Sequence, residues 1–261
     1  MVKWIYRDLT GKGGVGFQIK TFNFNFLKSI NRKAALLIQK VKQLKSVPPR
    51  KAALLTTASF AAIGPIYYLA TNPIAQVLHP NDNPIAQTVS FLVFGSYGWI
   101  QTSAFYILGA SFMALAAALF LKIKARVNWG AIAVFLIGVA FLLVAGNHTQ
   151  NTGIVTISEI IHRDAAFAIV GLSPLAYFLL APSLKAHGHR GLWIYSIIAG
   201  AIAILTLAVG LIPGATNLFL GALERILLFN GQMWGEIVCI SLIWATFRPK
   251  PANFSAVVSN E

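Results

Sequence analysis

Residues 128–146 read NWGAIAVFLIGVAFLLVAG and contain no charged side chain. A ~30 Å hydrocarbon layer requires about 20 predominantly apolar residues in a helix. Further apolar stretches of this kind lie at 52–71, 98–121, 160–182, 191–212 and 223–247. The sequence therefore predicts an all-α bundle of six transmembrane helices. Residues 85–97 are also apolar, and we expect them to form either an outer interfacial helix or an extension of the second span.

The Lys and Arg residues are distributed unevenly along the chain. Nineteen of the 21 lie in segments that share one side of the membrane in a six-span topology, namely 1–51, 122–126, 185–190 and 248–250. The intervening loops contain neither Lys nor Arg, and they are 72–97, 147–158 and 213–220. By the positive-inside rule, both termini are expected in the cytoplasm. A bacterial inner membrane is the expected location.

Composition supports the same class of protein. The chain is 57% hydrophobic and 11% charged, with a mean hydropathy of +0.69, whereas soluble domains carry about 25% charged residues. The net charge of +14 does not indicate nucleic acid binding, because most of this charge flanks apolar spans, where anionic lipid headgroups are the expected partner. Cys239 is the only cysteine, which excludes an internal disulfide and a site with several thiolates.

The chain is expected to comprise three segments. Residues 1–51 form a basic arm, residues 52–247 the membrane domain, and residues 248–261 a short cytoplasmic tail. Apolar residues recur at helical spacing from Leu27 to Leu44, with Lys and Arg on the remaining surface. This pattern predicts an amphipathic helix on the anionic inner membrane surface. Docking of a membrane protein partner is the alternative role for this helix.

A few ionisable residues interrupt the apolar spans. Arg163 and Arg225 depart from the charge rule, and each stands beside an acid, Asp164 or Glu224. Ionisable side chains near lipid are expected to face inward and pair. The i, i+4 spacing of Glu159 and Arg163 permits one such pair on a single helix.

Glu236 is the most unusual polar residue of the sixth span. It follows Arg225 by eleven residues, which places it ~16 Å deeper, near the bilayer midplane. Arg225, Gln232 and Glu236 share one helix face, and Gln101 of the second span is expected to meet this face. An acid at the midplane indicates a functional site.

The leading functional hypothesis is non-catalytic binding of a lipid or another small amphiphile in an outward-opening polar pocket, without a metal or cofactor. The expected lining residues are His148, Glu159, His162, Arg163, Glu224, Arg225, Gln232, Glu236 and Gln101. In this hypothesis Arg225 holds an anionic headgroup. The remaining histidines lie in loops and are expected in solvent, namely His79, His187 and His189.

Two other classes of function fit the same polar residues. The first is a proton- or ion-coupled transporter in which Glu236 is the coupling carboxyl, with helix breaks at Pro65 and Pro174. The second is a membrane metalloenzyme or haem protein that uses His148 and His162 as ligands.

Several motifs resemble those of a known family. Residues 95–101, GSYGWIQ, followed by Phe105 and Gly109, resemble the second-span signature of the DUF998 family, which has no established reaction. His162 with Ala166, and Glu224-Arg225 followed by Trp234, are similar to its fourth and sixth spans. The resemblance covers about residues 55–247 and implies a six-helix integral membrane protein. The chain is also similar in outline to the Frag/DRAM/Sfk membrane proteins.

Overall fold

The computed structural model describes residues 48–80, 82–123, 127–148 and 155–247. Residues from Pro49 onward form one compact unit. Its described part contains helices and loops but no strand, so the predicted all-α fold class is confirmed. The predicted amphipathic helix of the basic arm and the short tail fall outside the described residues.

Six long helices make up the described part of the chain. They are α2 (Pro49–Val77), α3 (Gly98–Lys122), α4 (Trp129–Gly146), α5 (Ile157–Ala186), α6 (Arg190–Gly210) and α7 (Ala215–Phe247). A short 3₁₀ helix, η1 (Val89–Val93), lies between α2 and α3. By length and composition, all six long helices are able to cross a membrane, which confirms the predicted number of spans.

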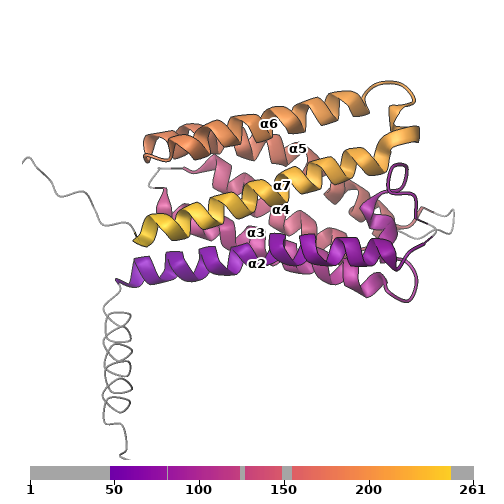
Figure 1. Ribbon diagram of the computed structural model, residues 1–261, viewed down its shortest axis with the longest axis horizontal. Helices are drawn as coiled ribbons and strands as arrows, with labels where there is room; N and C mark the ends of the chain where they lie inside the picture. Colours follow the sequence, from indigo (N-terminus) through magenta and orange to yellow (C-terminus); the bar gives the residue numbers. More distant parts are fainter. Residues whose placement is uncertain (1–47, 81, 124–126, 149–154, 248–261) are drawn as a thin grey trace, which may run out of the picture. The chain divides into compact units, whose positions relative to one another are not determined.

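The six long helices close into a ring. Each packs against the next along the chain in alternating directions, and α7 packs against α2 (Figure 1). Glycines allow α3 and α4 to approach closely, because a Cβ on Gly109 would lie 2.9 Å from the Gly138 carbonyl oxygen, and one on Gly138 would lie 2.8 Å from that of Gly109. Small residues at such crossings are typical of helices packed within membranes.

The alternating directions give the bundle two chemically different ends. We call the end where α2, α4 and α6 begin the basic end, and it carries Arg50, Lys51, Lys122, Lys185 and Arg190. We call the opposite end the acidic end, and its acids are Asp82, Glu159, Asp164 and Glu224. Which side of a membrane each end faces stays a prediction from the charge distribution.

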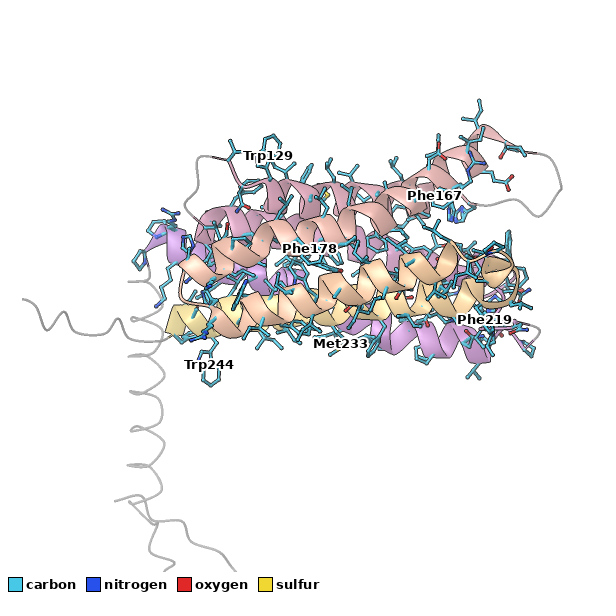
Figure 2. All side chains as sticks on the ribbon, turned by 90° about the horizontal axis from the view of Figure 1, so that it is seen from above. Trp129, Phe167, Phe178, Phe219, Met233 and Trp244 are labelled. Atoms are coloured by element: carbon cyan, nitrogen blue, oxygen red, sulfur yellow. The ribbon has the colours of Figure 1, made fainter. Side chains whose placement is uncertain are left out.

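The outward faces of the helices carry large apolar side chains. Trp129 and Trp244 project from the bundle near the basic end, and Phe219 lies at the acidic end (Figure 2). Fully buried aromatic side chains, including Tyr177 and Trp234, fill the interior. An exterior this apolar would be unfavourable in water and suits contact with lipid chains.

Candidate functional site

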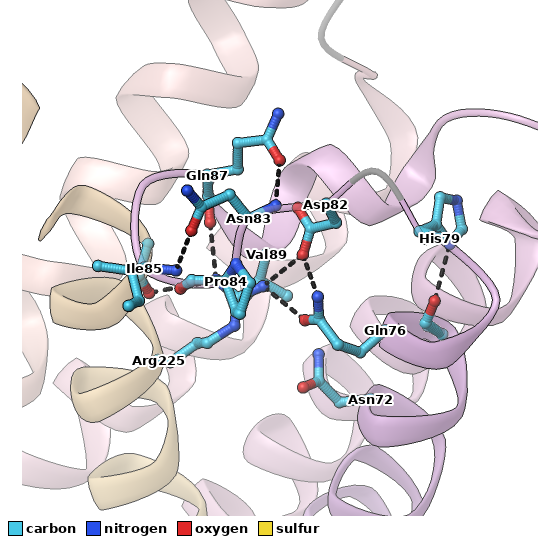
Figure 3. Close-up of polar contacts among 12 residues, drawn as sticks. Asn72, Gln76, His79, Asp82, Asn83, Pro84, Ile85, Gln87, Val89 and Arg225 are labelled. Atoms are coloured by element: carbon cyan, nitrogen blue, oxygen red, sulfur yellow. Dashed lines mark hydrogen bonds and ion pairs between the residues drawn. The ribbon is translucent and has the colours of Figure 1, made fainter. Parts of the chain in front are cut away.

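Arg225 ties the loop between α2 and η1 to α7 (Figure 3). Its Nη1 donates to the carbonyl oxygens of Pro84 at 2.9 Å and Gln87 at 2.7 Å. Its Nη2 donates to Gln76 Oε1 at 2.8 Å and Asp82 Oδ2 at 3.2 Å. Gln76 donates to the same Asp82 oxygen. Both terminal nitrogens of Arg225 are thus occupied, so its contacts do not support the expected role as an anchor for an anionic headgroup.

Glu224 and Arg225 are adjacent but do not form an ion pair with each other. Glu224 Oε2 instead accepts a hydrogen bond from the Val89 backbone N–H at 2.6 Å. One turn earlier in α7, Gly221 approaches the loop so closely that a Cβ would lie 2.1 Å from the Gln87 carbonyl oxygen. These contacts hold the loop and the start of η1 against the first turns of α7.

The segment around η1 folds back into the bundle, so both expectations for residues 85–97 were wrong. Val89 and Leu92 are completely buried. Gly95, between η1 and α3, adopts a φ of +76°. Few residues other than glycine adopt this conformation, so a glycine is needed where the chain turns from η1 into α3. The inward turn is possible because two polar groups of this segment have partners inside the bundle. The Val89 N–H donates to Glu224 of α7, and the Ser90 hydroxyl contacts His162 of α5, whereas lipid would leave both groups unpaired.

His79 links the end of α2 to the residue that follows η1. Its Nδ1 lies 2.7 Å from the Ala75 carbonyl oxygen and its Nε2 lies 2.6 Å from the Phe94 carbonyl oxygen. The expectation that His79 is freely solvated was therefore wrong, because its ring spans two backbone acceptors.

His162 is buried, and both of its ring nitrogens have partners. Nδ1 lies 2.7 Å from the Asn147 carbonyl oxygen and 3.1 Å from that of Val144. Nε2 lies 2.9 Å from Ser90 Oγ of η1. This arrangement fits a neutral imidazole that donates from Nδ1 and accepts from the Ser90 hydroxyl. His162 thereby joins α4, α5 and η1.

His148 and His162 do not form a metal site with neighbouring ligands. His148 is exposed, and its Nε2 lies 3.2 Å from Thr102 Oγ1. Within the described ranges, no three His, Cys, Asp or Glu side chains gather as a metal would require. The haem and metalloenzyme hypothesis therefore gains no support from the contacts of these two residues.

Glu159 and Arg163 do not form the pair that their spacing predicted. Arg163 instead pairs with Asp164 at 3.3 Å, with side chains 57% and 62% exposed. Such an exposed pair contributes only about 0–1 kcal/mol. The expectation that Arg163 faces inward was wrong, because Arg163 and Asp164 occupy an outward face of the first turns of α5, whereas Glu159 is partly buried.

A cavity lies inside the bundle between α3, α4, α5 and α7, next to Ser90 of η1. We call it the core cavity. Its volume is about 50 Å³, enough for a few water molecules at roughly 10–15 Å³ each. Its polar lining residues are Ser90, Ser173, Tyr177, Glu224 and Gln232. The remaining wall is mainly apolar and includes Phe105, Phe112, Ile137, Phe141, Val144, Ile169, Val170, Leu227 and Leu228.

Glu224 and Gln232 are the predicted site residues that line the core cavity. Gln232 is buried, and its Oε1 has no hydrogen-bond partner within the described residues. Gln101 is buried on α3, where its Oε1 accepts from Asn72 Nδ2 at 3.1 Å. Glu236 does not line the cavity and is half-buried one turn beyond Gln232, and its Oε2 also lacks a partner in the described structure.

Sequence reasoning missed Asp82, Gln76 and Ser90. Asp82 is a single acid in a loop that lacks Lys and Arg. The absence of a nearby cation was the available signal that Asp82 pairs with a cation from a distant segment. Nothing in the sequence distinguishes Ser90 from other small polar residues, because its contact with His162 joins positions 72 residues apart.

The chain was compared with known protein families, curated proteins and solved structures. Residues 62–241 match DUF998, a family of proteins of unknown function. No curated protein and no solved structure matches the chain. The outline similarity to the Frag/DRAM/Sfk proteins stays a prediction.

Proposed function

This six-span membrane protein belongs to the DUF998 family, and we propose that it binds a small neutral or cationic amphiphile in the core cavity. The composition of the cavity wall carries the proposal. Glu224 and Gln232 place polar groups in an otherwise apolar and aromatic space. A mainly apolar wall with a few polar groups is typical of sites for small molecules.

The polar groups of the cavity favour a ligand that donates hydrogen bonds. Gln232 Oε1 is buried without a donor in the described part of the chain, and leaving such a group unsatisfied costs about 1–3 kcal/mol. Glu224 adds a carboxyl group, and neither Lys nor Arg lines the cavity. A hydroxyl or ammonium head supplies the donors that these oxygens accept, whereas a phosphate head supplies further acceptors. The ligand therefore differs from the anionic lipid expected from the sequence.

The apolar part of the ligand lies between α5 and α7. Val170 of α5 and Leu227 of α7 line the cavity, and α5 and α7 are not principal packing partners of each other. The cavity of about 50 Å³ is smaller than the roughly 300 Å³ at the lower end for ligand pockets. Binding therefore requires the helices around the cavity to move apart.

Gln232→Leu tests the proposal because stability and binding are expected to change in opposite directions. Removing the amide, whose oxygen is unpartnered in the described structure, should stabilise the fold by about 1–3 kcal/mol, while the cavity loses one of its acceptors. We expect a higher thermal unfolding temperature and a loss of the small molecule detected by mass spectrometry of the purified full chain.

Asn230→Leu is the matched control. Asn230 is also a buried amide of α7, but its Nδ2 donates to the Ala199 carbonyl oxygen at 2.9 Å, and it does not line the cavity. This control should lower stability and retain the bound molecule. Equal amounts of the same co-purified molecules in the native chain and Gln232→Leu would refute the proposal.

A proton- or ion-coupled transporter is a second candidate function. Glu236 favours it, because its Oε2 is buried without a partner in the described structure. Pro65 lies within α2 and Pro174 within α5, and a proline within a helix leaves one carbonyl oxygen without its usual donor. We also propose that the basic end faces the cytoplasm of a bacterial cell, on the strength of the charge distribution.

A further inference from the structure

The basic end of the bundle contains a second pocket, remote from the core cavity. It lies at the end of α3, the turn between α5 and α6, and the last turns of α7, and its volume is about 440 Å³. We call it the basic pocket. Its lining includes an ammonium group, two imidazoles, a hydroxyl and an indole, from Lys122, His187, His189, Ser241 and Trp244.

The basic end has no carboxylate of its own in the described part of the chain. The described acids other than Glu236, which lies in the middle of α7, are at the acidic end. Both ion pairs among the described residues, Arg163–Asp164 and Arg225–Asp82, are there as well. The cations of the basic end therefore depend on anions from outside the described structure.

Lys122 is the Lys or Arg residue of the basic end that lines the basic pocket, and its charge has no compensating partner in the described structure. Arg50 donates to the Leu121 carbonyl oxygen at 2.8 Å, and the Lys185 ammonium lies 4.2 Å from the centre of the Trp193 ring. Lys122 has no ion pair or side-chain hydrogen bond to any described residue, and it lines the basic pocket. An anion within the pocket would supply its missing partner.

The first turn of α6 adds positive potential beside the pocket. α6 begins at Arg190, directly after the pocket residue His189. The first backbone N–H groups of a helix lack intrahelical acceptors and carry a positive partial charge. Phosphate groups bind at such positions, and here the helix start adjoins Lys122 and the imidazole of His187 in one pocket.

We propose that the basic pocket binds a phosphate group, either of an anionic phospholipid headgroup in the adjacent leaflet or of free phosphate. Lys122 and the His187 imidazole hold the phosphate oxygens, and Ser241 donates from its hydroxyl. Trp244 is 63% exposed and offers an amphipathic surface of the kind that sits at the level of lipid headgroups. The site belongs to the membrane domain and is separate from lipid binding by the basic arm.

The test measures binding of short-chain phosphatidylglycerol to the full chain in a neutral detergent by native mass spectrometry. Lys122→Gln removes the ammonium of the pocket. Lys51→Gln is the matched control, because Lys51 is exposed at the same end and does not line the pocket. Losing a charge-assisted hydrogen bond should weaken binding about tenfold in Lys122→Gln, whereas Lys51→Gln should stay within about twofold of the native chain.

Two further arms identify the source of the phosphate. Inorganic phosphate that displaces the lipid at millimolar concentration indicates a site for free phosphate, whereas phosphate without effect indicates a site for the headgroup. His187→Gln provides a second variant if Lys122→Gln does not elute as a single species in size-exclusion chromatography. Unchanged phosphatidylglycerol and phosphate affinities in the correctly folded pocket variants would overturn the proposal.

Discussion

Replacing Arg225 by leucine should be among the most destabilising single changes at the acidic end. The Asp82 side chain is completely buried, and Arg225, 20% exposed, is the cation that pairs with it. Removing one partner of a buried ion pair costs about 3–5 kcal/mol, because the other charge stays buried. Arg225→Leu also removes the donors to Pro84 and Gln87. We therefore expect Arg225→Leu to lower the free energy of unfolding by about 3–5 kcal/mol.

Asp82→Asn should cost less than Arg225→Leu. The asparagine keeps one oxygen that can accept from Gln76 and Arg225, and the partly exposed guanidinium of Arg225 retains its carbonyl acceptors. A lost hydrogen bond to a charged group accounts for about 1.5–3 kcal/mol. The double variant Arg225→Leu/Asp82→Leu should recover part of the loss, because neither charge is then left alone.

The assay is reversible unfolding of the full chain in mixed micelles of neutral detergent and dodecyl sulfate, followed by far-UV circular dichroism. Arg163→Leu is the control, because its pair with Asp164 is exposed and should contribute no more than about 1 kcal/mol. A loss below about 1 kcal/mol for Arg225→Leu would refute the reasoning. So would strictly additive effects in the double variant, since additivity indicates that the two side chains do not interact.

Two further substitutions test the contacts of α7. Gly221→Ala should lower stability by about 1–3 kcal/mol and speed proteolysis in residues 82–88, because its Cβ would overlap the Gln87 carbonyl. Gly171→Ala is the control, since its Cβ meets nothing within 4 Å, and equal proteolysis of both variants would contradict the expectation. If Glu236 couples transport, Glu236→Gln should abolish proton flux into proteoliposomes, measured with an enclosed pH-sensitive dye, and leave the unfolding temperature unchanged or higher. Proton flux equal to that of the native chain would exclude the transporter.

The six helices were predictable because hydrocarbon thickness dictates their length. The stretch at 128–146, for example, agrees closely with α4, Trp129–Gly146. Other helices extend beyond their predicted ends, and α2 continues to Val77 through Asn72 and Gln76. Hydropathy could not find this extension because it ends each span where polar residues begin, whereas here those residues have partners within the bundle.

The polar contacts were much less predictable because they join distant segments. Arg225 and Asp82 are 143 residues apart, while rules of helical spacing reach only three or four residues. Arg225 was therefore assigned to Glu224, its neighbour in sequence, and Arg163 to Glu159. In the fold, Glu224 turns to the Val89 backbone and Arg163 to the exposed Asp164. Sequence proximity identified polar residues of the acidic end and placed Asp164 beside Arg163, but it could not find partners in distant segments, such as Asp82 for Arg225.

The distinction between occupied and unoccupied polar groups decides where a ligand can bind. Arg225 and His162, both part of the motifs that resemble the family pattern, use their polar atoms to fasten the η1 region to the bundle. A ligand would have to break these contacts to reach them. In the described structure, the Gln232 side-chain oxygen in the core cavity and the Lys122 ammonium in the basic pocket have no hydrogen-bond or ion-pair partner. Because a ligand gains the most where no protein contact must be given up, binding should be sought at these two residues and not at Arg225 or His162.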